Sequence, residues 1–498
     1  MFYTNATLVG NNILLRQVKN GKRMNSKIPY SPKLYTKSNN KTGWKTIHEE
    51  YLEELPFSDI YEAKDFCKKY ADIPNFEIFG MTNYTYAFIS DNYKGKINWN
   101  MSDICVAYTD IEVDSSNGFP NPDTADSEIT AITMIVGDRT LAFGLPNYKK
   151  HKENVEYFKC TNEVALLESF ISYWTLFYPD IVTGWNSKQF DIPYLVNRIR
   201  RLLGDEAVNK LSPWGKVSQY KTEFRGKESI SYDILGVMHL DYYELYRKFS
   251  PAQNQENFKL DTIAGVELGD SKVDYAALGY KDLTDLYERN PQLYIEYNIK
   301  DTEIVVRLEE KLKLIELALT IAYDAKINYE DVFSPVKTWD VIIYNYLKEN
   351  GYIIPPNNKR ANKQAYDGAY VKDPVPGFYK WISSFDYESL YPKLIMMYNI
   401  SPETLIEPYD YTEQMYEIVS GQTINVDAIV KKTVDTSKLK ELGVTLTPNG
   451  QLFNIQKDGF LPVLMKRMFN DRKMYKNKML ECERELQEVK KEMTKRGL

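Results

Sequence analysis

The chain has 498 residues, more than one hydrophobic core supports, and therefore predicts three or more domains. With 43% hydrophobic residues and a formal net charge of −6, the composition is globular and argues against DNA binding through overall positive charge, so any nucleic-acid surface must be local. Four scattered cysteines without CxxC spacing and only three histidines offer no zinc site and indicate reduced thiols in a cytoplasmic setting.

Residues 1–104 predict a small β-rich or α/β module without identifiable chemistry. Short β-rich runs occur at 7–9 and 13–15, and a helical segment follows at 58–70.

From about 104 to 332, predicted strands and helices alternate, which indicates an α/β core of the ribonuclease-H type. Apolar residues at helical spacing predict a helix over 163–178. Two alternating runs around a short turn predict a β-hairpin over 217–232.

Four carboxylates lie in three segments of this core. Asp110 and Glu112 alternate at the end of a predicted strand, and Asp191 closes a turn that contains Trp-Asn. Asp301 follows Tyr297 at four residues, so both side chains share one face of a predicted helix. Alone, each piece is more often structural, as a solvated strand end or an ordinary helix face. Together and in this order, the acids predict a site for two divalent metals and phosphodiester hydrolysis.

These segments resemble the proofreading 3′–5′ exonuclease domain of family B DNA polymerases, with the polymerases of T-even-type bacteriophages as the nearest likeness. By this resemblance Asp110, Glu112 and Asp301 would hold the catalytic metal, and Asp110 with Asp191 the second. Tyr297 would orient the attacking water, because a phenol with a pKa near the usual ~10 is a poor base at neutral pH. The expected cofactor is Mg²⁺, two ions per active site, and Mn²⁺ suits the same oxygen ligands.

The resemblance also implies contacts with DNA. Phe119, within Gly-Phe-Pro, would press on the terminal base, with a packed loop aromatic as an equally weighted alternative. The hairpin turn with Arg225 and Lys227 would help to peel the primer end into the site, and a solvated hairpin without that role is its alternative. Gly368 and Tyr370, in a turn-rich link, would touch template DNA.

The C-terminal third carries elements of a second site. A helix is predicted over 334–347, a strand over 381–386 and a long helix over about 461–495. Arg472 and Lys476 lie four residues apart on the long helix and therefore share a face. This segment is similar to the first fingers helix of the family, whose basic pair grips the β- and γ-phosphates of the incoming nucleotide. A charged, solvated helix is the alternative.

Residues that follow the predicted strand resemble motif A of the same family, Asp-x-x-Ser-Leu-Tyr-Pro. The resemblance implies that Asp386 binds both metals of the polymerase site, assisted by the Tyr387 carbonyl. Ser389 and Leu390 would cradle the triphosphate of a dNTP through their amides, and Tyr391 would block a ribose 2′-OH.

Two positions depart from the motif. Glu388 stands where Thr or Asn is usual, and Lys393 stands where a small Ser is typical. These departures put the details of the nucleotide pocket in doubt and leave Asp386 unaffected.

The implied fold is α/β and multidomain: a ribonuclease-H-like 3′–5′ exonuclease domain with an incomplete family B palm and fingers. The resemblance covers slightly more than half of a complete family polymerase, and the second palm carboxylate and second fingers helix are not found. The predicted boundaries are an N-terminal domain at 1–104 and again, with a linker, at 336–380, an exonuclease domain at 105–335, a partial palm at 381–460 and a first fingers helix at 461–498.

We therefore expect the N-terminal subunit of a split DNA polymerase, acting on primer–template DNA, a single-stranded 3′ end and dNTPs. A C-terminal partner chain would complete the palm, fingers and thumb and would bring any sliding clamp. A truncated chain, a stand-alone 3′–5′ exonuclease and a non-catalytic DNA-binding assembly subunit are the alternatives; the complete set of four acids disfavours the last. No signal peptide or membrane span is indicated, so the expected location is the cytoplasm, that of the host if the protein is viral.

Overall fold

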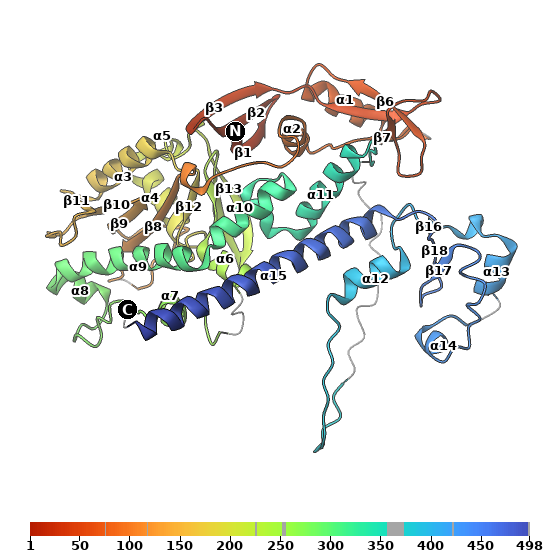
Figure 1. The fold of residues 1–498 in the computed structure, drawn as a ribbon. Helices are drawn as coiled ribbons and strands as arrows, with labels where there is room; N and C mark the ends of the chain where they lie inside the picture. The colour runs from red at the N-terminus through yellow and green to blue at the C-terminus, as the bar shows by residue number, and fades with distance from the viewer. Residues whose placement is uncertain are drawn as a thin grey trace. The chain divides into compact units, whose positions relative to one another are not determined.

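The computed structural model describes residues 1–74, 76–116, 118–224, 227–250, 255–355, 373–420 and 423–496 (Figure 1). The chain forms two compact units. The first comprises residues 1–37, 53–350 and 354–356, and the second comprises 38–52, 351–353 and 357–498. The domain boundaries expected from the sequence stay predictions.

The first unit begins with an antiparallel three-stranded meander, β1-β2-β3. Its strands are joined by tight turns at Gly10 and Gly21, both at positive φ, where glycine avoids a Cβ clash. Helix α1, which Asp59 caps through its side chain, confirms the helix predicted over 58–70. The elements of this part are β1 Phe2–Val9, β2 Asn12–Lys19, β3 Lys22–Pro29, β4 Lys33–Lys37, α1 Ile60–Tyr70, β7 Ile78–Phe79, α2 Tyr84–Asn92 and η1 Met101–Asp103.

A mixed six-stranded sheet forms the core that follows, in the order β11-β10-β9-β8-β12-β15. Its central strands are almost wholly buried, as expected for strands covered on both faces. Helix α9 packs on one face and α3 and α4 pack on the other (Figure 1). This is the predicted α/β core. The elements are β8 Val106–Val113, β9 Ile129–Val136, β10 Arg139–Gly144, β11 Val155–Lys159, α3 Glu163–Phe177, β12 Ile181–Thr183, α4 Asp191–Leu203, β15 Met238–His239 and α9 Pro291–Leu312.

A buried ion pair fixes α4 against α3. The Arg198 guanidinium donates to both carboxylate oxygens of Glu163 at 2.7 and 2.6 Å, and Glu163 also accepts the Ile129 amide at 2.7 Å. One carboxylate thus joins the start of α3, the middle of α4 and the start of β9. The pair also helps to hold the first residue of α4, Asp191, which is one of the four predicted acids.

The remaining elements of the first unit confirm two further predictions, the hairpin over 217–232 and the helix over 334–347. They are α5 Asp205–Asn209, β13 Val217–Phe224, β14 Lys227–Ile234, α6 Tyr242–Phe249, α7 Leu260–Leu268, α8 Leu283–Arg289, α10 Leu314–Ala325, η2 Tyr329–Phe333 and α11 Pro335–Glu349. The antiparallel register of β13 and β14 pairs Val217 with Ile234 and Phe224 with Lys227.

The second unit has a small sheet, β16-β18-β17, and the long helix α15. Asn399, in the left-handed region at φ 54°, ties these parts together. Its side chain donates to the carbonyls of Asn454 and Lys457 at 2.6 and 2.9 Å and accepts the Gly459 amide at 2.9 Å. The elements are β5 Trp44–Lys45, α12 Leu390–Tyr398, β16 Leu405–Ile406, η3 Pro408–Asp410, α13 Glu413–Ser420, α14 Val426–Val430, β17 Val444–Leu446, β18 Leu452–Asn454 and α15 Phe460–Lys495, with β6 Tyr51–Pro56 beginning in this unit and ending in the first.

Two predictions for the second unit have opposite outcomes. The long helix predicted over about 461–495 is confirmed by α15. The strand predicted over 381–386 is wrong: these residues have no regular structure and their side chains are exposed. A strand needs a hydrogen-bonded neighbour, and no strand within the described ranges pairs with this segment.

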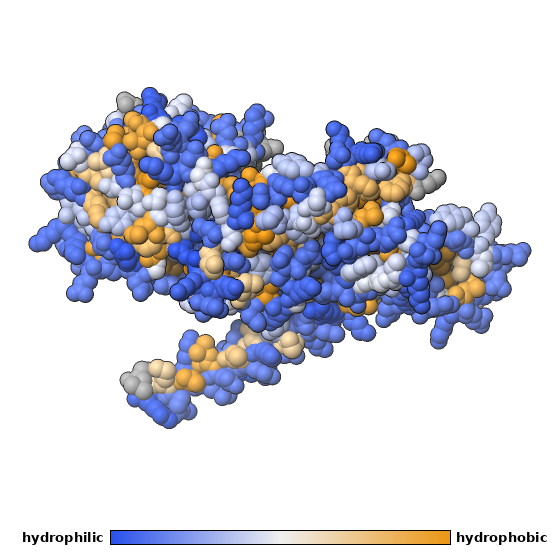
Figure 2. Space-filling view, turned by 90° about the horizontal axis from the view of Figure 1, so that it is seen from above, coloured by the Kyte–Doolittle hydropathy of each residue, from blue (hydrophilic) through white to orange (hydrophobic). Residues whose placement is uncertain are grey.

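Hydrophilic residues predominate on the face seen in Figure 2, with apolar side chains in scattered patches between them. Among the residues that the structure describes, no helix combines the length and apolar composition needed to cross a membrane.

Candidate active site

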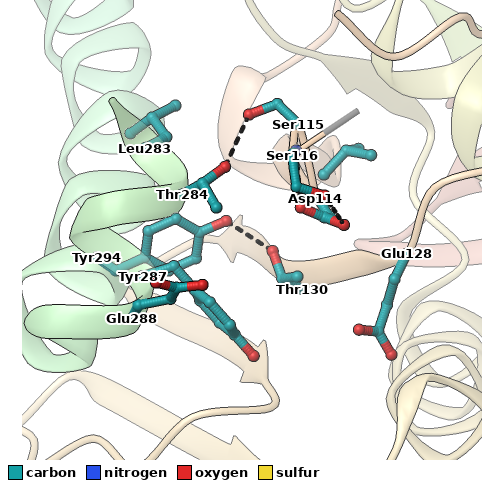
Figure 3. Close-up of a pocket in the computed structure, with 11 residues that line it drawn as sticks. Asp114, Ser115, Ser116, Glu128, Thr130, Leu283, Thr284, Tyr287, Glu288 and Tyr294 are labelled. Atoms are coloured by element: carbon teal, nitrogen blue, oxygen red, sulfur yellow. Dashed lines mark hydrogen bonds between the residues drawn. The ribbon is translucent and has the colours of Figure 1, made fainter. Parts of the chain in front are cut away.

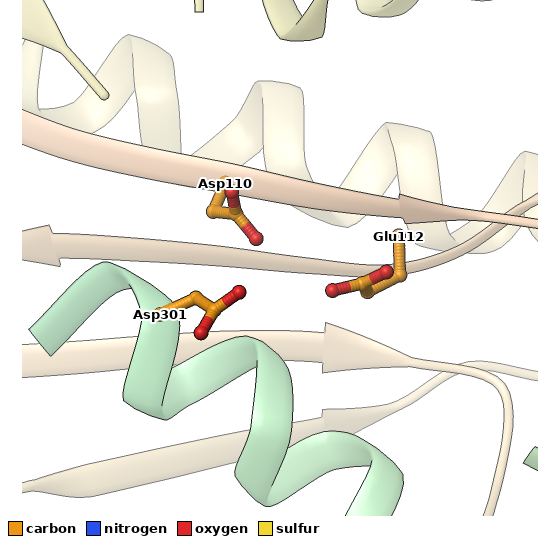
Figure 4. A group of neighbouring side chains, drawn as sticks. All are labelled: Asp110, Glu112 and Asp301. Carbon is orange, nitrogen blue, oxygen red and sulfur yellow. The ribbon is translucent and has the colours of Figure 1, made fainter. Parts of the chain in front are cut away.

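Three of the predicted acids meet between the sheet and α9. Asp110 and Glu112, two residues apart on β8, project from the same face of the strand, and Asp301 reaches toward them from α9 (Figure 4). One oxygen from each carboxylate lies within 4.8 Å of the other two. Residues almost two hundred positions apart therefore offer ligand atoms to one point in space.

Neighbouring polar groups hold these acids in place. The Asn298 side-chain amide donates to Asp110 Oδ2 at 2.8 Å and accepts the Thr133 hydroxyl at 2.5 Å. Asp191, the fourth predicted acid, accepts the backbone amide of Ile111 at 3.1 Å. Asp191 is thus anchored on β8 between Asp110 and Glu112, although it stands outside the group of three.

The turn that leads to Asp191 depends on Gly184, next to the end of β12. A Cβ at this position would lie 2.5 Å from the Thr109 carbonyl oxygen, well inside a normal contact. Only glycine allows the turn to pass this close to β8, so the residue is required for the placement of α4 and its first residue.

Burial and mutual repulsion make the cluster electrostatically strained. Burial raises the pKa of Asp110 well above its ordinary value, and the carboxylates of Asp191, Glu112 and Asp301 raise it further. Burial and then Asp301 raise the pKa of Glu112 to about 8, and burial raises that of Asp191 to about 7 despite the Ile111 amide. Such a site favours a bound cation, which offsets the repulsion.

The residues present fit a divalent metal. Asp301 Oδ1 is buried and has no hydrogen-bond partner among the described residues. Buried polar atoms without partners are rare, and this carboxylate oxygen is therefore free to bind a ligand such as a metal ion. Because all the donors are carboxylate oxygens, the set suits a hard cation such as Mg²⁺ or Mn²⁺, with Asp110, Glu112, Asp301 and Asp191 as the residues that would hold it.

Lys272 also belongs to the site, and the sequence interpretation missed it. Its ammonium pairs with Asp301 Oδ2 and lies 3.3 Å from the Tyr297 hydroxyl. Burial opposes its charge, but the attraction of Asp301 raises its pKa overall, so it stays protonated. Burial and the negative charge of Asp301 raise the pKa of Tyr297, which keeps its hydroxyl neutral. Lys272 lies in a loop without periodic pattern, so no sequence signal marked it.

A cavity of about 210 Å³ lies where β8 ends, lined by residues from that end and from α8 and α9 (Figure 3). Thr130 forms part of its wall: its hydroxyl is 2.6 Å from the Tyr294 hydroxyl and also donates to the Glu112 carbonyl at 3.2 Å. Asp114, Glu128 and Glu288 line the cavity, and three carboxylates disfavour phosphate there.

Of the residues predicted to contact DNA, Phe119 lies within the described ranges. Phe119 is 87% exposed, and its ring centroid lies 5.5 Å from that of Phe190. Arg225, Gly368 and Tyr370 lie outside the described residues, as does the side chain of Lys227. Their roles stay predictions.

Around the second predicted site, the side chains are open to solvent. Asp386, Tyr387 and Tyr391 are exposed. Arg472 Nη1 lies 3.5 Å from Glu388 Oε1. The residue of α15 that is predicted to bind phosphate therefore faces one of the two positions that depart from motif A.

Ser389 and Leu390 begin α12, with Ser389 in the left-handed region at φ 54°. Lys393 is 4.0 Å from Glu388, and its ammonium lies 5.4 Å from the centroid of the Phe469 ring. Lys476 is exposed on α15, one helical turn beyond Arg472.

Comparison with known proteins gives the same assignment for both halves of the chain. A family model described as the exonuclease domain of DNA polymerase family B matches residues 81–263, and one described as DNA polymerase family B matches residues 338–495. The chain is 33% identical to the DNA-directed DNA polymerase of Escherichia phage RB69 over 97% of its own length and 54% of that protein. It is 32% identical to the DNA-directed DNA polymerase of Enterobacteria phage T4, over 98% of this chain and 55% of the relative.

More distant similarity extends to eukaryotic viruses. The DNA polymerase catalytic subunit of Equine herpesvirus 2 is 28% identical over 63% of this chain and 33% of that protein. The chain spans about half the length of the phage polymerases it matches. The two family matches, the similarity to the phage enzymes over nearly the whole of this chain and the α/β core with its converging acids agree: this chain belongs to DNA polymerase family B.

Proposed function

We propose that this chain is a divalent-metal-dependent 3′–5′ exonuclease that shortens DNA ends and serves as the proofreading activity of a family B DNA polymerase. The observation that carries the proposal is the convergence of Asp110, Glu112 and Asp301, whose ligand oxygens lie within 4.8 Å of one another. The unpartnered Asp301 Oδ1 supports it, because that buried oxygen is free to bind a cation.

The residues of the chain would divide the work as follows. Bound Mg²⁺ would lower the pKa of a water molecule and stabilise the leaving 3′ oxygen. Tyr297, neutral because its pKa is raised, would hydrogen-bond this water and orient it toward the scissile phosphate. Lys272 would offset part of the negative charge while holding the Tyr297 hydroxyl, and Asn298 would keep Asp110 in its rotamer.

Phe119 would supply the contact that brings the DNA end to these acids. An exposed ring beside a catalytic site offers a face on which a terminal base can stack, whatever its sequence. The β13–β14 hairpin would help to separate the primer end from its template.

We further propose that nucleotide addition around Asp386 requires a C-terminal partner chain. Two-metal nucleotidyl transfer needs more than one carboxylate, and within the described ranges no three metal-binding side chains gather around Asp386. The partner would supply the second palm carboxylate, close the dNTP site over Arg472 and Lys476, and carry any clamp contact. Replicating DNA in the cytoplasm would be the substrate.

The test is digestion of a 5′-labelled single-stranded oligonucleotide with Mg²⁺. Asp110→Ala is expected to slow shortening about 100-fold or more. Each loss of about 1.36 kcal/mol of transition-state stabilisation lowers the rate tenfold. Asp123→Ala, an exposed acid of the same region, is the matched control and should digest as the wild type does. Equal digestion by Asp110→Ala contradicts the site. Primer extension with dNTPs by the chain alone contradicts the need for a partner.

A further inference from the structure

Asp270 lies outside the acid cluster, yet it fastens the loop that bears Lys272 to α9. Its Oδ2 accepts the Lys300 ammonium at 2.5 Å and also pairs with Arg307 Nη1. Lys300 and Arg307 are seven residues apart, two helical turns, and therefore lie on one side of α9. Asp301, the metal-site acid, is the residue next to Lys300 on the same helix.

The loop has a second anchor on α7. Lys272 donates its backbone amide to Asp261 Oδ1 at 2.8 Å, and Asp270 donates its own to the Ala264 carbonyl at 3.3 Å. Asp270 and Lys272 are two residues apart, so their Cα atoms are separated by at most ~7 Å. Fixing Asp270 on α9 therefore fixes the point from which the Lys272 side chain starts.

A lysine side chain loses rotamer entropy when it is ordered, and a loosely held loop would add backbone entropy to that loss. The pairing of Asp270 removes much of this freedom before substrate arrives. The Lys272 ammonium then lies 3.3 Å from the Tyr297 hydroxyl and bonds Asp301.

We propose that Asp270 is a positioning residue of the exonuclease reaction, which holds Lys272 between Tyr297 and Asp301 by pairing with Lys300 and Arg307. The inference rests on the proposed nuclease function. The ion pairs are partly exposed, at 27% for Asp270, 29% for Lys300 and 42% for Arg307, so their contribution to stability is small. Loss of the Asp270 carboxylate is therefore expected to lower kcat and to change the stability of the fold little.

The experiment is a double-mutant cycle on Mg²⁺-dependent digestion of a 5′-labelled single-stranded oligonucleotide by the full chain. Asp270→Asn is expected to lower kcat about tenfold with KM changed less than about twofold, as for other residues that orient a site residue from outside. Asp270→Glu keeps the charge and should recover most of this loss. In a Lys272→Met background, adding Asp270→Asn should change kcat by less than about twofold, because the residue it positions is gone.

Asp285→Asn is the matched control, since Asp285 makes a comparable partly exposed ion pair with Arg289, 3.0 Å long, away from Lys272. It should leave kcat unchanged. Wild-type kcat in Asp270→Asn overturns the inference, and so does an equal loss with and without Lys272, which would indicate a general structural effect. A wild-type chain that digests nothing overturns the proposed function itself, and the inference with it.

Discussion

At the scale of one residue, Glu112 illustrates how burial and repulsion between carboxylates affect this site. It is buried beside Asp301, and both effects raise its pKa to about 8. Its unfolded pKa is about 4.3. Between these values the folded state keeps a proton that the unfolded state has lost, so the free energy of unfolding falls as pH rises.

We therefore predict that the metal-free protein loses stability from about pH 5 to pH 8. Mg²⁺ should oppose this loss most strongly at the high end, because its ligands must be deprotonated. Thermal unfolding with EDTA and with Mg²⁺ across this range measures both effects. Glu112→Gln should flatten the metal-free slope while leaving the contributions of Asp191 and Asp241, whose pKa values burial raises to about 7. An unchanged slope in this variant contradicts the prediction.

The Phe119 side chain contributes little to the stability of the fold, since it is 87% exposed. We predict that Phe119→Ala raises KM for single-stranded DNA about tenfold, because a base stacked on an aromatic ring contributes ~1–3 kcal/mol. The unfolding midpoint should stay the same. Phe378→Ala, at a ring 91% exposed in the second unit, is the control and should leave KM unchanged. A KM equal to that of the wild type would remove Phe119 from the site.

At the scale of elements, the position of Asp191 depends on how α4 is held. The buried Arg198–Glu163 pair provides that hold, and removing one partner would leave a buried charge unpaired. We predict that Arg198→Met destabilises the first unit by about 3–5 kcal/mol, whereas Arg139→Met, which breaks an exposed pair, costs under about 1 kcal/mol. Hydrogen exchange of α3 and α4 amides measures both.

Adding Glu163→Gln to Arg198→Met separates charge from packing. The glutamine keeps an acceptor for the Ile129 amide but removes the unpaired charge, so part of the stability should return. No recovery would show that the loss came from packing alone.

Elements with strong local patterns were predictable from the sequence. The helix from Glu163 has apolar residues at helical spacing and an Asn cap, and α15 is a long, uninterrupted helical run. The conformation of residues 381–386 was not predictable, because an alternating apolar run forms a strand only where a neighbouring strand accepts its hydrogen bonds. Asp110, Glu112 and Asp301 could be proposed as a cluster from order and context. Lys272 could not, because its place follows from the docking of a loop without pattern.

At the scale of the whole molecule, the second unit exposes large apolar side chains near motif A. Trp381 is 99% exposed, Phe378 91% and Phe385 90%. We predict concentration-dependent self-association of the isolated chain through this segment, measured by sedimentation velocity. Phe378→Ser with Trp381→Ser should lower the mean mass while exonuclease activity is kept. A wild-type chain that stays monomeric at every concentration contradicts both this prediction and the expected partner surface.

The acids of the cluster are also translated at different times during synthesis. Asp110 leaves the ribosome about 190 residues before Asp301, which corresponds to roughly 10–40 s at ~5–20 residues per second. During this interval the sheet can form while Asp301 is still untranslated, so the nascent chain holds the strands but not all the acids of the proposed metal site. Hydrolytic activity would therefore begin only when α9 docks, and a ribosome stalled before that helix would display a nuclease domain that cannot yet cut.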